Sequence, residues 1–156
     1  MRKAEIMMKK KLYAAYGSNL NLGQMARRCP TARVLGASVL KDHRLLFRGA
    51  RWGSVATVEP CEGGSVPVLV WEITPEDEKA LDFYEGFPFL YGKKTIELPL
   101  KGRAVMTMVY VMTPGRLQGQ PGQNYYAAIL EGYRAAGFDP AILRAAADIS
   151  QGGTAE

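Results

Sequence analysis

The segment Tyr16-Gly17-Ser18-Asn19-Leu20 has the residue types and the position to bind an anion. It lies where an apolar, strand-like run ends and a helix-like run begins. Several backbone N–H groups at such a junction can point at one place and stabilise a carboxylate or a developing oxyanion. The alternative is an ordinary strand–turn–helix junction, in which Gly17 takes a positive φ and Asn19 caps the helix.

Glu85 is the carboxylate whose surroundings best suit proton transfer. Four aromatic residues flank it in the sequence: Phe83, Tyr84, Phe87 and Phe89. Where such rings cover a carboxylate, desolvation raises its pKa toward neutrality, and the last turn of a helix acts in the same direction. Such a group is an effective general acid/base near pH 7. The alternative is an exposed helix-end glutamate that pairs with Lys93 or Lys94.

Other catalytic chemistries have weaker support. Ser18 does not lie in a G-x-S-x-G motif, and His43 is the single histidine that could serve as its base. A pair of Cys29 and His43 has no supporting signature. The few cysteines and one histidine do not favour a zinc site. We expect no metal and no cofactor, and we expect Cys29 and Cys61 to be reduced thiols.

Tyr91, Tyr125 and Tyr126 are candidate contacts for a small polar ligand. Each is a polar-tipped aromatic residue beside a segment that the sequence predicts to be a loop. Their hydroxyl groups could bind a ligand, or the rings could simply be half-buried with the hydroxyl in water.

The charge of the chain is uneven. The 156 residues carry a formal net charge of +5, of which residues 1–11 contribute +4. We therefore expect a basic tail over 1–11, one domain over 12–149 and a flexible tail over 150–156. Whether 1–11 is native is open, since Met7 or Met8 could be the start. We expect no nucleic-acid partner, no membrane partner and a cytoplasmic location.

The hydrophobic pattern predicts short strands and a few helices without regular βαβ alternation. We expect strands over 12–16, 32–47 (broken at 41–44), 52–59, 66–73, 95–100 and 104–112, with turns at Gly63-Gly64 and Lys101-Gly102. We expect helices over 21–28, 74–85, 124–136 and 140–148, with a loop over 114–122. This order indicates an α+β fold with a mostly antiparallel or mixed sheet, which could close as a barrel.

Taken together, these segments resemble the γ-glutamylcyclotransferase-like family, which includes the AIG2-like proteins. The resemblance rests on residues 16–20 (YGSNL), 28–32 (RCPTA), 81–86 (LDFYEG), Tyr91 and 121–125. In order and spacing these pieces span most of the chain, from Leu12 to Gly137.

The resemblance implies a small mixed β-barrel flanked by two or three helices. It also implies a cavity in which the 16–20 segment binds a γ-glutamyl group and Tyr91 and Tyr125 line the wall. The family's catalytic glutamate corresponds to Glu85. The implied reaction converts the γ-glutamyl group of a small amide or peptide to 5-oxoproline and releases an amine or amino acid.

Several questions stay open at this stage. The same fold could be a non-catalytic module that binds an amino-acid-like ligand. The segment 16–20 could hold either the substrate's α-carboxylate or the oxyanion. The leaving amine is not identified, and we expect loops 87–90 and 114–123 to form its pocket. The oligomeric state and the pathway are not determined.

Overall fold

The computed structural model describes residues 9–155 of the chain, with side chains described up to residue 150. The predicted basic tail over 1–11 falls mostly outside the described residues, as does Glu156. The predicted flexible segment over 150–156 begins inside a helix that continues to Ala155. Within the described residues, no helix is long and apolar enough to span a membrane.

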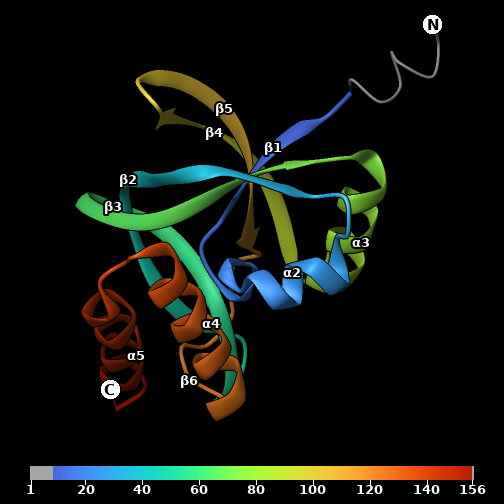
Figure 1. Cartoon of the computed structure of the whole chain (residues 1–156). Coiled ribbons are helices and arrows are strands. Elements are labelled where there is room, and N and C mark those ends of the chain that lie inside the picture. Colours follow the sequence, from blue (N-terminus) through green and yellow to red (C-terminus); the bar gives the residue numbers. More distant parts are fainter. Residues whose placement is uncertain (1–8, 156) are drawn as a thin grey trace, which may run out of the picture.

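The sheet is mixed and follows the order β2-β3-β1-β5-β4, with β6 paired to β3 outside this path (Figure 1). Strand β1 runs antiparallel to β3 and parallel to β5, while β2–β3 and β4–β5 are antiparallel pairs. The strands are β1 (Lys11–Ala15), β2 (Arg33–Arg48), β3 (Trp52–Ile73), β4 (Tyr91–Leu100), β5 (Arg103–Met112) and β6 (Gln120–Pro121).

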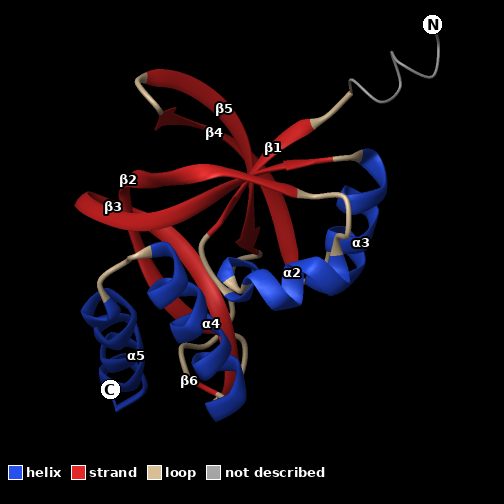
Figure 2. Cartoon of the chain, viewed as in Figure 1, coloured by secondary structure: helices blue, strands red, loops and turns tan. Residues whose placement is uncertain are grey.

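The helices form two groups beside this sheet (Figure 2). Helices α4 and α5 lie along the β2–β3 ribbon, and α2 and α3 lie together on the other side of the view. The helical elements are the 3-10 turn η1 (Ser18–Leu20), α2 (Leu22–Arg28), α3 (Pro75–Glu85), α4 (Gln123–Ala136) and α5 (Pro140–Ala155). The α+β class expected from the sequence is confirmed.

The sheet is not closed into a barrel, so that part of the prediction is wrong. Strands β2 and β4 are the two ends of the strand order, and no ladder joins them in the described part of the chain. Their contact includes a side-chain hydrogen bond, from the Ser38 hydroxyl to the Pro99 carbonyl. Pro99 has no N–H group to offer a neighbouring strand, which disfavours closure at this edge.

Strands β2 and β3 are much longer than expected. The predicted break at 41–44 and the predicted turn at Gly63-Gly64 face each other as an irregularity inside one continuous hairpin. Asp42 takes a positive φ of 60°, and its carboxylate accepts a hydrogen bond from the N–H group of Gly63. A Cβ on Gly64 would lie 2.3 Å from the carbonyl oxygen of His43, so this glycine permits close backbone approach.

Helix α3 begins and ends where the sequence predicts. Thr74 and Asp77 form a reciprocal capping box, Pro75 occupies the first turn, and Gly86 ends the helix with a φ of 66°. These signals fix the position of Glu85 in the last turn. The predicted cap of α2 is wrong, because the side chain of Asn21, not of Asn19, accepts the hydrogen bond from the backbone of Gln24.

The remaining differences are in element length. Strand β4 begins at Tyr91 rather than 95, because Tyr91 already pairs with Met112 on β5. The turn between β4 and β5 is the predicted pair Lys101-Gly102, with positive φ at both residues. The predicted loop over 114–122 contains the short strand β6, and α5 extends beyond the predicted end at 148.

Candidate active site

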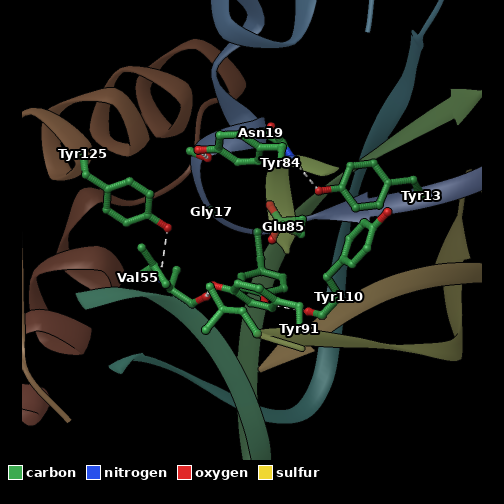
Figure 3. Close-up of a pocket in the computed structure, with 13 residues that line it drawn as sticks. Tyr13, Gly17, Asn19, Val55, Tyr84, Glu85, Tyr91, Tyr110 and Tyr125 are labelled. Atoms are coloured by element: carbon green, nitrogen blue, oxygen red, sulfur yellow. Dashed lines mark hydrogen bonds between the residues drawn. The ribbon is translucent and has the colours of Figure 1, made fainter. Parts of the chain in front are cut away.

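A partly open cavity of about 200 Å³ lies where β1, β3, α3 and β5 meet. Figure 3 shows the Glu85 carboxylate pointing into its middle, with tyrosine rings around it. The lining residues are Tyr13, Tyr16, Gly17, Ser18, Asn19, Val55, Ala56, Tyr84, Glu85, Leu90, Tyr91, Tyr110 and Tyr125. The structure therefore brings together the predicted site residues except Leu20 and Tyr126.

One wall of the cavity is the unpaired edge of β3. Strand β1 pairs with residues 69–73 of β3 and β6 pairs with Trp52 and Ser54, which leaves the stretch between them without a strand neighbour on this side. At Ala56 two tyrosines take the place of a strand. The backbone N–H group of Ala56 donates to the Tyr125 hydroxyl at 2.9 Å, and the Tyr91 hydroxyl donates to the Ala56 carbonyl at 2.5 Å. Both tyrosine rings are thereby fixed against the wall.

Residues 16–20 carry the chain from β1 into the 3-10 turn η1. Gly17 has a φ of −120°, so the positive φ expected in the ordinary-junction alternative is not observed. A Cβ on Gly17 would lie 3.3 Å from the Cβ of Ala56 and 3.5 Å from the Tyr125 hydroxyl. Glycine is favoured here because the loop passes close to the cavity wall.

Leu20 anchors the loop and does not line the cavity. Its side chain is fully buried, and a Cβ on Gly132 of α4 would lie 2.6 Å from it. Its backbone N–H group already donates to the Gly17 carbonyl at 3.0 Å. The N–H groups of Ser18 and Asn19 belong to the first turn, where the helix itself supplies no acceptor. These two amides are the better candidates to meet an anion.

Asn19 is held by a buried hydrogen-bond chain instead of capping a helix. Its amide nitrogen donates to the Tyr13 hydroxyl at 2.8 Å, and its amide oxygen accepts from the guanidinium of Arg28. The same guanidinium lies 3.4 Å from the ring centre of Tyr84. The Tyr84 hydroxyl is 3.0 Å from the Ser18 hydroxyl, which joins α2, α3 and the loop at the cavity mouth.

Glu85 has no polar partner among the described side chains. No hydrogen bond or ion pair of residues 9–150 involves its carboxylate. Burial raises its pKa from 4.5 to about 7, against a smaller opposite effect of the Arg28 charge. The carboxylate is therefore present in both protonation states near neutral pH, as a group that accepts and returns a proton must be.

Glu85 does not pair with Lys93, so that alternative is wrong. The Lys93 ammonium lies 2.6 Å from Glu78 and 2.8 Å from Asp82. The aromatic residues next to Glu85 in the sequence contribute less to its desolvation than expected, because Phe83 is 91% exposed and Phe89 is 82% exposed. The desolvation comes largely from tyrosines on distant strands.

The charge of Glu85 also affects the tyrosines around it. Burial raises the pKa of Tyr13, Tyr16 and Tyr91, and the nearby Glu85 carboxylate raises it further. These hydroxyl groups therefore stay protonated and act as hydrogen-bond donors or acceptors. The Tyr16 hydroxyl donates to the Tyr110 carbonyl at 2.6 Å, so it stiffens the wall.

Sequence reasoning missed Tyr13 and Tyr110 as cavity residues, and it treated Tyr84 only as a neighbour of Glu85. Tyr13 and Tyr110 lie in apolar strands, where a tyrosine commonly places its polar tip at a cavity or another polar group. That signal was present in the sequence but is weak for a single residue. Arg28 was noted only as part of a motif, although its stacking on Tyr84 places it at the mouth.

The structure does not bring Cys29 and His43 together as a catalytic pair. Cys29 is a buried free thiol whose Sγ lies 3.5 Å from the Asp77 carbonyl, and burial raises its pKa to about 11. The ring of His43 lies instead 2.9 Å from the Lys41 carbonyl, on β2. Cys61 is also a free thiol. The two thiols are not bonded to each other.

Comparison with known proteins decides the family. Residues 13–135 match the family model described as γ-glutamyl cyclotransferase, AIG2-like. The chain belongs to this family. The matched range begins at Tyr13 and contains every residue that lines the cavity. No curated protein matches the chain significantly.

Solved structures share the fold of this family member. A structure described as a γ-glutamyl cyclotransferase has a TM-score of 0.79 at 24% identity, over 88% of this chain and 86% of its own. The structure of an uncharacterized human protein has a TM-score of 0.78 at 25% identity, over 88% of this chain and 86% of its own. A yeast γ-glutamyl cyclotransferase specific to glutathione has a TM-score of 0.63 at 12% identity, over 91% of this chain and 96% of its own.

Proposed function

We propose that this protein converts the γ-glutamyl group of a small γ-glutamyl amide or peptide to 5-oxoproline and releases an amine or amino acid. The observation that supports this most directly is the Glu85 carboxylate, which lies buried in the cavity without a polar partner among the described side chains and has a pKa of about 7. Membership of the γ-glutamyl cyclotransferase family supports the same class of reaction.

The reaction needs little from the protein beyond positioning and proton transfer. The α-amine of the substrate attacks its own γ-carbonyl carbon, so the nucleophile and electrophile are parts of one molecule. A new bond forms between the α-nitrogen and the γ-carbon, and the bond from that carbon to the leaving nitrogen breaks. The cavity would hold the flexible γ-glutamyl chain in the folded conformation that brings these atoms together.

Glu85 would move the proton that this exchange requires. In its ionised form it removes a proton from the α-ammonium group, which frees the lone pair for attack. In its protonated form it gives the proton to the leaving nitrogen as the tetrahedral intermediate collapses. As the lactam forms, the ring nitrogen loses a second proton, which the released amine takes up to become an ammonium group. The carboxylate then ends ionised as it began, and a pKa of about 7 suits both of its steps near neutral pH.

The backbone amides of Ser18 and Asn19 would hold a negative group of the substrate. This group is the α-carboxylate or the oxyanion of the intermediate. The buried tyrosine hydroxyls beside them provide further polar contacts in a site that excludes much of the water.

The test is 5-oxoproline release from a panel of γ-glutamyl dipeptides and γ-glutamylamines by wild type and by Glu85→Gln. We expect the variant to lose about 10²–10⁴-fold in kcat, because it keeps the shape but cannot carry the proton. Wild-type kcat/KM should rise with pH through about 7, as the general base ionises.

Glu76→Gln is the matched control, since Glu76 is exposed in the first turn of the same helix. It should retain wild-type turnover. Full activity of a folded Glu85→Gln protein would remove Glu85 from the mechanism. Tight binding of γ-glutamyl compounds without any product would instead favour a non-catalytic binding module.

A further inference from the structure

A second hollow adjoins the cavity, on the outer side of Tyr84. It is open to solvent and has a volume of about 380 Å³. We name it the arginine recess after two of its residues. It is lined by Gln24, Arg27, Arg28, Tyr84, Asn124 and Tyr125. Because Tyr84 and Tyr125 line both hollows, the recess and the cavity share a wall.

We propose that the arginine recess binds the carboxylate of an amino-acid leaving group, so that γ-glutamyl dipeptides are preferred over uncharged γ-glutamylamines. This inference rests on the proposed cyclotransferase function. It replaces the expectation that loops 87–90 and 114–123 form the leaving-group pocket with a site built mainly from helix α2.

The small size of the cavity supports a separate leaving-group site. Its volume of about 200 Å³ lies below the roughly 300–1,000 Å³ that is usual for small-molecule pockets. It is suited to one amino-acid-sized group, and the γ-glutamyl group would occupy it. The remainder of the substrate must then extend beyond the wall, and the recess is the adjoining hollow.

The charge of the recess selects an anion. Arg27 and Arg28 both line it, and none of its lining residues is acidic. Gln24 and Asn124 add amide groups that can donate hydrogen bonds. A carboxylate placed here would meet two positive charges and further donors, whereas an uncharged amine-derived group would leave them without an anionic partner.

Arg28 is held in a fixed orientation for this role. Its guanidinium stacks 3.4 Å from the ring centre of Tyr84 and lies 3.3 Å from the side-chain oxygen of Gln24. A further hydrogen bond goes to Asn19 in the wall of the cavity. A guanidinium has five N–H donors in a planar fork, so these contacts leave others for a carboxylate. Little side-chain entropy would be lost on binding.

The order of residues along α3 fits the path of the substrate. Tyr84 faces the recess, and the next residue, Glu85, points into the cavity (Figure 3). The scissile bond would cross the wall between them. The leaving nitrogen is then within reach of the Glu85 carboxylate, while the carboxylate of the leaving amino acid lies beside Arg27 and Arg28.

The experiment compares the γ-glutamyl dipeptide that wild type cyclises fastest with the same compound bearing a C-terminal amide. The two substrates differ only in the charge of the leaving group. We expect wild type to favour the carboxylate by about tenfold or more in kcat/KM, chiefly through KM. The preference should weaken at high ionic strength, because salt screens exposed charges.

Arg27→Glu should reduce this preference to about twofold or less, and Arg27→Gln should give an intermediate value. Arg27 is the more specific position to change, because a substitution of Arg28 would also remove its contacts with Asn19 and Tyr84. The matched control is Arg103→Glu, at the far end of the β4–β5 hairpin from Tyr91. It should leave the carboxylate preference at its wild-type value.

The outcomes separate the two proposals. Product formation without a carboxylate preference, or turnover of γ-glutamylamines alone, would overturn the recess and leave the cyclotransferase function standing. A preference that survives Arg27→Glu unchanged would also overturn it. Failure to release 5-oxoproline from any substrate would overturn both.

Discussion

Three carboxylates lie on one face of α3, and their surroundings give them different roles. Glu78, Asp82 and Glu85 are spaced by four and three residues, so their side chains share that face. Burial alone raises the pKa of Glu78, but Lys93 and Lys11 together hold it below its ordinary value. Glu85 lies beyond these lysines, among tyrosines, and burial raises its pKa toward neutrality.

Arg28 is the charge that opposes the raised pKa of Glu85, so its removal should change the pH profile. We expect Arg28→Met to raise the Glu85 pKa further, because a nearby positive charge favours the ionised form. The acid limb of kcat/KM should therefore move to higher pH. The measurement is a pH profile with an uncharged γ-glutamylamine, which removes any effect of a leaving carboxylate.

Arg28→Lys is the matched control, since lysine keeps the charge but loses the planar fork. Its acid limb should stay near that of wild type. An acid limb at the wild-type pH in Arg28→Met would show that the guanidinium has no electrostatic effect on Glu85.

The raised pKa of Glu85 could be inferred from the sequence, but its environment could not. The flanking aromatic residues and the helix end suggested a raised pKa, and the direction is as expected. The cause differs, because Phe83 and Phe89 point to solvent. The desolvating rings, such as Tyr16 and Tyr91, are brought near only by the fold, and no local pattern indicates that contact.

At the scale of elements, α3 shows how local signals place the Glu85 side chain in the cavity. Its capping box at Thr74 and Asp77 and its left-handed Gly86 define both ends, so the last turn is fixed relative to the sheet. Thr31, in the connection from α2 to β2, lies 3.0 Å from the Thr74 hydroxyl and donates to Asp77 at 2.7 Å. The start of α3 is therefore tied to the segment that follows α2.

Loss of the cap should lower stability without changing the chemistry. We expect Thr74→Ala to reduce the free energy of unfolding by about 1–2 kcal/mol, because the backbone N–H group of Asp77 loses its acceptor. The melting temperature should fall by about 2–8 °C. The activity at temperatures well below the transition should remain near wild type.

Thr95→Ala, at an exposed position of β4, is the matched control for removal of a threonine side chain. It should change the melting temperature much less. Equal effects of the two substitutions would argue that the capping box contributes nothing specific to stability.

The sequence correctly predicted element ends that are marked by capping or turn residues. It did not predict the length of strands that depends on pairing with another strand. The ends of α3 and the turn at Lys101-Gly102 follow from capping and turn residues. The polar segment 41–44 and the pair Gly63-Gly64 looked like breaks when taken separately. They are opposite parts of one irregular hairpin, a fact that emerges only from the register between β2 and β3.

For the molecule as a whole, the open sheet explains where the site lies. Because β1 and β6 pair with only the two ends of β3, the stretch between them is available for the tyrosines that build the cavity. Elements from the whole length of the chain, from Tyr13 to Tyr125, meet there. A buried carboxylate in such a place lowers the stability of the native state, since folding disfavours its ionised form.

This cost gives a prediction about stability and pH. The Glu85 pKa is raised from 4.5 to about 7 by folding, so the native state binds the proton more tightly than the unfolded chain. Wild-type stability should therefore fall, relative to Glu85→Gln, as pH rises from about 4.5 to about 7, and the difference should then stay constant. Above pH 7 the variant should be more stable by about 1–3 kcal/mol, a reduced value for a side chain that is not fully buried.

Chemical denaturation of both proteins between pH 4 and 9 measures this difference directly. Glu97→Gln, on an exposed position of β4, controls for the loss of one negative charge from the molecule. A stability difference between wild type and Glu85→Gln that does not change with pH would mean that folding does not perturb this carboxylate. Glu85 would then be ionised throughout the neutral range and would be a poor donor for the leaving nitrogen. If the stability advantage of Glu85→Gln over wild type increases only between pH 4.5 and 7, the stability of the whole molecule depends on the same protonation of Glu85 as the proposed catalysis.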